Sequence, residues 1–591
     1  MQAPASCSTS EYRSTDGSCN NLKHPTWGMA SRPYAELAGF HYADGKHELA
    51  RALSGNKLPS ARKISSELFL SKDRIDDDYN LMAAQYGQII ALDMGLTYAP
   101  RTGADSFSCC VNGKLTEEVK QKDKCAPIAV PSDDPAFGPR NISCFDFTRT
   151  AATHDYSSSG PHEVAQPISA VTSWLDLFFV YGNGGEESDS IRAFEYGFLN
   201  TVLREGEEWP AGYEDITPGT TSESDFLPKK DHVKTNPKHQ LTPLQVLWWR
   251  EHNRLALMLC ILNPHWSEDR VFEEARRITI AQYQHITYNE YLPLILSKKY
   301  VEEMKLYFPK SEGCINDYDS SLDPSVTIEH TSIGVYGNSN ATGYIPDQYA
   351  DFRSIQIQRG RDLGVASYVK VRRFCGLPVP NCFEDLINVC KISSKNVEIL
   401  KRLYERVDDV ELAVGAALEP PRAGALCGET SHCVISDGFK KGRRGDRFFY
   451  QNCEQGKFTP EQLKTIQETT LSRIICFNSE IPHMQPKAFK PISKTNRLKS
   501  CDDYPPLRIH YWCEHEAVPL DNSTVDKIAM EVKLEERSND TAKRGGPQRP
   551  RIVAVVTVRL RIGVPNACGR IPDEKTLGHE ATNKSSVPHL N

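Results

Sequence analysis

The apolar residues in the middle of the chain recur at helical spacing. Between residues 241 and 296 they follow one another at steps of three and four, as in Leu244, Leu247, Trp248, Leu255, Leu259 and Leu262. Thr242 before Pro243 is a typical helix start, because proline at the first helical position loses no hydrogen bond. Asn263 and Pro264 end this helix, and Ser267 followed by acidic residues begins another. The pattern therefore predicts two long consecutive helices.

Weaker helical patterns lie on both sides of this stretch. They predict helices within residues 60–98 and 168–200, and again at 363–373, 383–417 and 459–476. The intervening segments are rich in Gly, Pro, Ser and Asn, which favour loops. We expect a mainly α fold with long loops and little β structure. The predicted organisation is an extended arm (1–60), a helical domain (61–504) and a charge-rich, partly disordered C-terminal extension (505–591).

The composition is that of a globular chain and argues against a membrane-spanning or nucleic-acid-binding protein. The 39% hydrophobic and 25% charged residues are ordinary for a globular chain. There is no run of eighteen apolar residues, so no membrane span is expected. The net charge of −7 is spread along the chain without a basic stripe, which argues against nucleic acid as a partner.

Cysteines and glycosylation motifs point to an oxidising compartment. The chain has 18 cysteines and five Asn-x-Ser/Thr motifs, at Asn141, Asn340, Asn522, Asn539 and Asn583. Residues 1–20 show neither a basic nor an apolar segment typical of a signal peptide. Three explanations are open: the sequence is that of the mature chain, its gene model is truncated, or export is unconventional. We favour a truncated sequence of a secreted glycoprotein.

Several motifs occur in the order found in one known family. They are YRSTDGSCNNLKHPTWG (12–28), PSDDPAF (131–137), REHNRLA (250–256), LNPHW (262–266), EEARR (273–277), QHITYNEYLP (284–293), QRGRD (358–362), RRFCGLP (372–378), GDRFFY (445–450) and SRIIC (472–476). Together they resemble the animal haem peroxidase family over roughly residues 7–504. The resemblance implies a haem-peroxidase-like helical domain. It also implies haem, hydrogen peroxide and a small substrate such as a phenol or halide, in oxidative-stress or extracellular crosslinking chemistry.

The distal segment of the family keeps only part of its pattern here. The family sequence G-Q-x-x-D-H-D corresponds to residues 87–93, in which Gln88 and Asp93 match. Ala91 stands at the haem-linking aspartate and Leu92 at the distal histidine. Leucine cannot transfer protons, and general acid–base groups typically contribute ~10²–10⁴ in rate. This substitution alone predicts weak or absent peroxide cleavage.

A second distal segment also departs from the family. Lys234 takes the position of the distal arginine, and Pro237 that of a second haem-linking carboxylate. Lysine keeps the charge but not the planar donor fork of arginine. His232 and His239 lie nearby in sequence, and we interpret them as exposed loop residues rather than as a replacement base.

On the proximal side, a helix segment is apparently deleted near residues 326–358. The motif LDPSV ends at Val326, and no histidine occurs between residues 331 and 362. His330 is a possible substitute axial ligand, but we interpret it as a surface loop residue. By resemblance, Arg359 matches the arginine near a haem propionate, and Gln356 replaces the asparagine that orients the axial histidine. Both residues could instead be structural.

Part of the family's calcium site is retained. Asp93, Thr172, the Trp174 carbonyl and Asp176 occupy ligand positions, whereas Phe178 replaces a hydroxyl ligand. Calcium takes six to eight oxygen ligands, so the loss of one weakens the site without preventing binding.

The remaining candidates are cysteines and two histidines. The resemblance implies the disulfides Cys375–Cys433 and Cys476–Cys501. Further pairs are expected for Cys7 with Cys19 and among the four cysteines at 109, 110, 125 and 144, with the connectivity open. We interpret Cys260 as a buried apolar residue. His252 and His285 lack metal-ligand spacing and are predicted to make structural hydrogen bonds.

Three hypotheses follow from this sequence. The chain is a haem peroxidase with weak activity or none; it is a pseudoperoxidase acting as a secreted binding or structural module; or an exon lost near Val326 hides the axial helix of an active enzyme. The third explains the deletion but not the changes at Ala91, Leu92, Lys234 and Pro237. We therefore favour loss of catalysis, with only weak residual haem binding.

Overall fold

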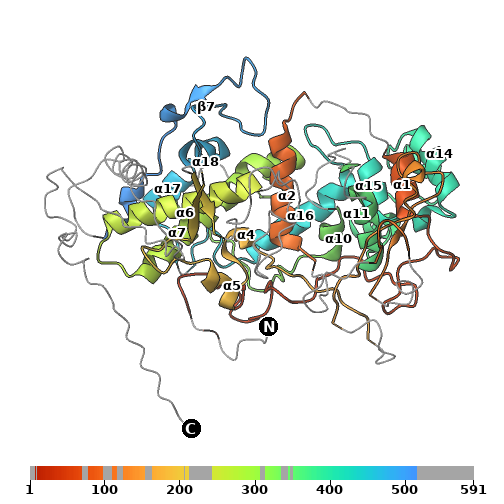
Figure 1. The fold of residues 1–591 in the computed structure, drawn as a ribbon, viewed down its shortest axis with the longest axis horizontal. Helices are drawn as coiled ribbons and strands as arrows, with labels where there is room; N and C mark the ends of the chain where they lie inside the picture. Colours follow the sequence, from red (N-terminus) through yellow and green to blue (C-terminus); the bar gives the residue numbers. More distant parts are fainter. Residues whose placement is uncertain are drawn as a thin grey trace, which may run out of the picture.

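A computed structural model describes residues 7, 9–69, 77–97, 109–115, 124–153, 163–204, 207–211, 242–306, 313–333, 344–345, 350–454 and 456–514. Within these ranges the chain is built mainly of helices, which confirms the predicted fold class (Figure 1). Residues 9–60 contain no helix and begin the chain as an irregular segment. The division into an arm, a domain and an extension stays a prediction.

The two central helices form as the apolar pattern predicts. Helix α6 (Thr242–Leu262) and helix α7 (Glu268–Ile286) pack against each other along their length (Figure 1). The Ser267 hydroxyl caps α7 by accepting from the backbone N–H of Arg270 at 3.3 Å. Leu255 and Leu259 are fully buried. These helices form one side of the apolar core.

After α7 the backbone changes its helical pitch. A π-helical turn, η3 (Thr287–Tyr291), leads into α8 (Leu292–Ile295) and then α9 (Lys298–Glu303). Such single π turns are rare and are frequently found at functional sites. This turn directs Asn289 and Glu290 toward a cavity that is described below.

Helix α2 lies in the middle of the molecule. It runs over Leu81–Gly95 and stands between the α6–α7 pair and a second group of helices (Figure 1). The Tyr86 hydroxyl is 3.1 Å from that of Thr287, which ties α2 to η3. At the start of α2, the side-chain amide of Asn80 donates to the carbonyls of Ala488 (2.7 Å) and Lys490 (3.2 Å).

The remaining helices follow the predicted ranges approximately, except those at residues 328–333, 352–362 and 429–444, which lie outside every predicted range. They are α1 (Ala61–Leu68), α10 (Ile328–Ile333), α11 (Phe352–Asp362), α12 (Tyr368–Phe374), α13 (Asp385–Asn388), α14 (Ser394–Leu403), α15 (Leu412–Leu418), α16 (Glu429–Arg444), α17 (Pro460–Ile466) and α18 (Leu471–Asn478). The helix expected from residue 363 begins only at Tyr368. Gly364 has a φ of 65° and turns the chain after α11.

The helix predicted over residues 168–200 is largely wrong. Only the short α4 (Phe178–Tyr181) and α5 (Gly185–Ser190) occur there. Leu177, Gly182 and Gly184 have positive φ values, and these interrupt a regular helix. The side chain of Asp93 also accepts hydrogen bonds from the backbone of residues 177 and 178, which fixes this irregular path.

The β structure is small, as expected. Four antiparallel two-stranded ladders pair β1 (Ile128–Ala129) with β2 (Cys144–Phe145), β3 (Thr201–Arg204) with β4 (Glu207–Pro210), β5 (Tyr344–Ile345) with β6 (Ala350–Asp351), and β7 (His483–Met484) with β8 (Lys499–Ser500). Short 3₁₀ turns are η1 (Gly138–Arg140), η4 (Val407–Asp409), η5 (Cys501–Asp503) and η6 (Ile509–Trp512).

Six disulfides crosslink the described residues. The implied pairs Cys375–Cys433 and Cys476–Cys501 are confirmed, as is Cys7–Cys19. The open connectivity resolves into Cys109–Cys125 and Cys110–Cys144. A sixth pair, Cys314–Cys453, was not anticipated. Cys260 is unpaired and half-buried.

The end of the described chain packs on the central helices. Trp512 in η6 is buried, and its indole N–H donates to Glu274 of α7 at 2.8 Å. The amide of Asn263 donates to the carbonyl of Trp512 at 3.0 Å. The chain therefore stays attached to the helical body beyond residue 504. The rest of the predicted extension, residues 515–591, lies outside the described ranges.

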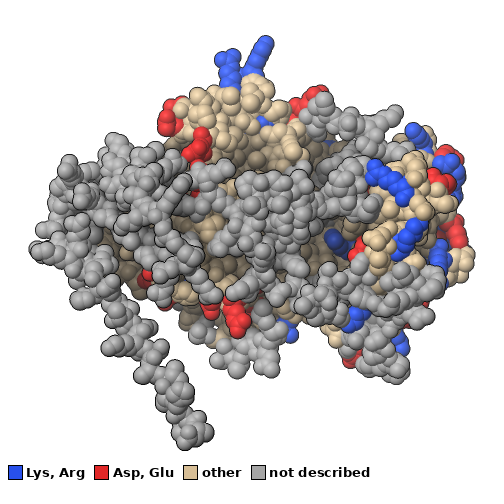
Figure 2. Space-filling model, viewed as in Figure 1, with Lys and Arg blue, Asp and Glu red and all other residues tan. Residues whose placement is uncertain are grey.

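Acidic and basic side chains are mixed on the described surface, as they are along the sequence. On the face in Figure 2, basic and acidic side chains are intermixed at the right-hand end, over the region of α1 and α14. In the described part of the chain, no helix is both long and apolar enough to cross a membrane.

Candidate functional site

The predicted distal residues lie on helix α2. Gln88 and Leu92 are four residues apart and so share one face of the helix. The carbonyl oxygen of the Gln88 amide is buried without a hydrogen-bond partner. Leu92 is half-buried and offers only methyl groups. This face therefore supplies an amide but no titratable group. Lys234 and its neighbours His232, Pro237 and His239 lie outside the described residues.

The interpretation of His330 as a surface loop residue is wrong. His330 lies in α10 and is only 3% exposed. Neither ring nitrogen makes a hydrogen bond of good geometry with a described residue. Burial lowers the pKa of His330 to about 4, and a weaker contact with the Val434 backbone of α16 offsets part of this lowering. A Cβ added at Gly438 of α16 would lie 2.4 Å from its Nδ1 atom. The imidazole therefore packs edge-on against the α16 backbone.

Gln356 and Arg359 lie on helix α11 behind α10. The Gln356 amide donates to the carbonyls of Ser332 (2.8 Å) and Ile333 (3.3 Å), so it caps the end of α10. It makes no hydrogen bond to His330. Arg359 is half-buried and forms no side-chain hydrogen bond or ion pair with the described residues. Its guanidinium is therefore available to an anion.

These contacts do not fit a haem-ligating centre. An axial histidine directs one nitrogen to the iron and donates from the other to a second residue. His330 makes no hydrogen bond of good geometry with a described side chain, and its Nδ1 side faces the α16 backbone at Gly438. Helices α2 and α10 also meet directly, since a Cβ at Gly95 would lie 2.9 Å from the Thr331 hydroxyl. The described residues thus lack both an oriented ligand and space at this contact.

The retained calcium-site residues do come together. Asp93 of α2 is fully buried, and its carboxylate accepts from the backbone N–H groups of Leu177 (3.3 Å) and Phe178 (2.7 Å). Burial and the nearby Asp176 carboxylate raise the pKa of Asp93 well above its ordinary value. Burial also raises the pKa of Asp176 to about 6. Two acidic side chains are thus buried together, and the charges of Arg13 and Arg276 offset only part of the cost for Asp176.

The loop that carries Asp176 is held by its own polar groups. The Thr172 hydroxyl donates to Asp176 at 2.8 Å, while the other oxygen of Asp176 is buried without a hydrogen bond. Trp174, which lies between Thr172 and Asp176 in the sequence, is fully buried. The side chain of Phe178 provides no oxygen, so only its backbone N–H contributes, and it does so to Asp93. The described residues contain no cluster of three or more acidic, histidine or cysteine side chains that could hold a metal, so a cation here would also need hydroxyl and carbonyl oxygens.

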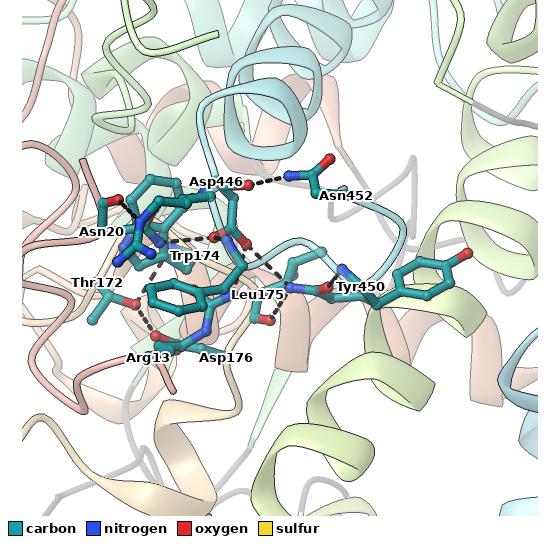
Figure 3. Close-up of polar contacts among 12 residues, drawn as sticks. Arg13, Asn20, Thr172, Trp174, Leu175, Asp176, Asp446, Tyr450 and Asn452 are labelled. Carbon is teal, nitrogen blue, oxygen red and sulfur yellow. Dashed lines mark hydrogen bonds and ion pairs between the residues drawn. The ribbon is translucent and has the colours of Figure 1, made fainter. Parts of the chain in front are cut away.

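A buried ion pair lies beside this loop. The Arg13 guanidinium is 2.7 Å from the Asp446 carboxylate, which also accepts from the amide of Asn20 at 2.7 Å (Figure 3). Arg13 partly offsets the raised pKa of Asp176. Neither Arg13 nor Asp446 was predicted as a site residue. Both nevertheless belong to the motifs YRSTDG and GDRFFY, which could have indicated them.

The two histidines of the central helices are structural. His252 is fully buried between the Tyr181 hydroxyl and the Gly197 carbonyl, each at 2.9 Å. His285 pairs with the Tyr450 hydroxyl at 2.9 Å. Both residues thus make structural hydrogen bonds of the predicted kind.

Comparisons with known proteins identify the family model and the relatives that this chain matches. Residues 12–345 and 341–489 match the family model described as animal haem peroxidase, in two segments that meet inside the region of the expected deletion. A peroxidase of Drosophila melanogaster is 32% identical, over 87% of this chain and 84% of its own length. A chorion peroxidase of Drosophila melanogaster is 30% identical, over 86% of this chain and 72% of its own length.

A solved structure shares the fold. Peroxidase A from Dictyostelium discoideum superposes with a TM-score of 0.63 at 22% identity, covering 82% of this chain and 100% of that one. The helical core, the motif order and these matches agree. The chain belongs to the animal haem peroxidase family.

Proposed function

We propose that this chain is a peroxidase-fold protein that binds haem weakly, does not turn over hydrogen peroxide, and acts as a secreted binding or structural module. The observation that carries the proposal is Leu92 on α2 at the position where the family has a histidine. No side chain on the Gln88–Leu92 face can accept the first proton of peroxide.

The proximal contacts support the same conclusion. His330 is the histidine nearest the position of an axial ligand in sequence, yet it packs against Gly438. Gln356 is already bonded to the carbonyls that end α10. Haem bound in this family supplies the redox chemistry at its iron. Among the described residues, Gln356 is bonded to other groups and His330 is packed on α16, which supports weak haem binding.

We also propose secretion and an accessory calcium ion. Six disulfides are typical of an oxidising compartment, and one relative is named a chorion peroxidase. Asp93, Asp176, the Thr172 hydroxyl and the Trp174 carbonyl would hold the calcium. Its role would be to neutralise two buried carboxylates and fix the loop on α2.

A turnover assay tests the proposal. The full chain is incubated with haem, and oxidation of a phenol by hydrogen peroxide is measured against the same amount of free haem. We expect no excess rate from the protein. We also expect Leu92→His to give none, because one distal base cannot replace a missing axial ligand. A rate well above free haem in either protein would contradict the proposal.

A second candidate function is peroxidase activity that uses His330 as the axial ligand. The guanidinium of Arg359 favours it, because it forms no ion pair with the described residues and a haem propionate would provide the opposite charge. Under this hypothesis the haem spectrum would depend on His330 and would be lost in His330→Ala. If the spectrum did not differ between the two proteins, the second candidate would be excluded.

A further inference from the structure

A large cavity lies at the start of helix α2, away from the distal residues. It measures about 850 Å³ and is bounded by η3, α8, α9 and loop segments near residues 422–424 and 487–490. Tyr79, just before α2, forms part of its wall. From Asn80 to Leu92 the helix rises about 18 Å, at roughly 1.5 Å per residue. The cavity is thus separate from the predicted haem site. We call it the basic cavity.

One part of the basic cavity is apolar. Pro293 and Leu294 of α8 line it and are half-buried, and Phe489 contributes a buried aromatic ring. Phe489 packs on Tyr291 with ring centres 5.6 Å apart, so this wall is fixed by the core. Cavities that hold small organic molecules are usually lined in this way, with a few polar groups at defined places.

Three basic side chains at the cavity have no acidic partner. Arg422, Lys487 and Lys490 line it and form no ion pair with any described residue. Lys490 lies over the ring of Tyr79 at 5.3 Å, and Arg422 lies over the ring of Tyr300 at 5.4 Å. These contacts leave the positive charges unneutralised. Lys298 and Lys299 also line the cavity but face Glu302 and Glu303, each at 3.8 Å.

The acidic residues of the wall do not balance this charge. Glu303 faces Lys299 across one turn of α9. Glu290, in the π turn, accepts from the backbone N–H of Leu471 at 3.1 Å, and burial raises its pKa to about 8. At neutral pH Glu290 is therefore mostly uncharged. The basic cavity consequently keeps an excess of positive charge beside an apolar wall.

We propose that the basic cavity binds an amphipathic organic anion. Arg422, Lys487 and Lys490 would pair with a carboxylate or sulfonate head, and the apolar body would lie against Leu294 and Phe489. An ordinary inorganic anion would not use the apolar wall, and a neutral apolar molecule would leave the cations unpaired. This assigns a ligand class to the proposed binding module. It does not depend on the loss of peroxide chemistry, because the two sites are separate.

The test is a fluorescence titration of the full chain with 11-(dansylamino)undecanoic acid, followed by its methyl ester. We expect saturable binding of the acid at one site and at least tenfold weaker binding of the ester. The double variant Arg422→Ala/Lys487→Ala should weaken binding of the acid at least tenfold. Both residues are exposed, so the fold should be unaffected, and thermal melting followed by circular dichroism checks this.

Two controls make the result specific. Lys395→Ala removes an exposed cation of α14 that does not line the cavity, and it should leave binding unchanged. Leu294→Gln should weaken binding of the acid, because it removes an apolar contact while the three cations remain. Equal affinity for acid and ester, or no effect of the double variant, would overturn the proposal. Tighter binding of a sulfated hexasaccharide than of the acid would overturn it too, in favour of a polysaccharide surface.

Discussion

The buried imidazole of His252 must stay neutral in the folded protein. One ring nitrogen accepts from the Tyr181 hydroxyl and the other donates to the Gly197 carbonyl. Burial lowers the pKa of His252 to about 3, whereas an unfolded histidine titrates near about 6.5. Between these values the unfolded chain binds the extra proton. The contribution of His252 is therefore complete above pH 6.5 and is lost as the pH falls toward 3.

The variant His252→Gln tests this titration. At pH 7.5 we expect it to be less stable than the parent by about 1–3 kcal/mol, because buried hydrogen bonds are lost. The difference should shrink as the pH falls to 4.5, since only the parent carries the titrating group. Denaturant unfolding at both pH values measures it. A constant difference would show that His252 does not titrate in this way.

At the same scale, Asp93 and Asp176 form a pair of buried carboxylates. If calcium binds between them, saturation at about 100 times its dissociation constant should stabilise the fold by about 2.7 kcal/mol. The melting temperature of the parent should therefore rise with calcium. Asp176→Asn should remove that rise and should melt higher than the parent without calcium, because the cost of burying the Asp176 carboxyl group beside Asp93 is then absent.

The control for this experiment is Asp189→Asn, on the exposed surface of α5. It should keep the full response to calcium. If the parent showed no response to millimolar calcium, the partial ligand set would be insufficient for binding.

At the scale of elements, the contact between α10 and α16 is decisive for the proximal side. Gly438→Ala would place a methyl group 2.4 Å from Nδ1 of His330. We expect this overpacking to cost about 1–3 kcal/mol. Gly442→Ala in the same helix meets the Met94 methyl at 3.6 Å and the Ser173 carbonyl oxygen at 3.8 Å, which are ordinary van der Waals contacts. It should stabilise the protein by about 0.5–1 kcal/mol through helix propensity.

Chemical denaturation of Gly438→Ala and Gly442→Ala tests whether the His330 imidazole is packed against α16. Opposite signs would confirm that His330 is packed onto α16. If Gly438→Ala were as stable as Gly442→Ala, the imidazole would be free to turn away from α16, and axial ligation by His330 would become plausible.

Elements differ in how far their sequence determines them. Helices α6 and α7 were predicted because one apolar face and the Ser267 cap are both local signals. The segment around α4 was mispredicted because its path depends on Asp93, 84 residues away from Leu177 in sequence. His330 was placed on the surface for a similar reason, since its burial comes from α16.

At the scale of the whole molecule, family and fold were predictable from motif order, and two disulfides followed from the same resemblance. The pair Cys314–Cys453 joins residues 139 apart and no local pattern indicates it. The basic cavity was also missed, because its walls come from segments spread between residues 79 and 490. Only the folded chain brings these cations to one apolar wall.

We have proposed that this peroxidase-fold chain binds haem weakly and does not ligate its iron through His330. The most direct test is an absorption spectrum of the full chain after addition of haem. We predict a spectrum like that of free haem, with no change specific to the protein when hydrogen peroxide is added. A strong Soret band that shifts with peroxide and disappears in His330→Ala would contradict the claim and restore this chain to the active peroxidases.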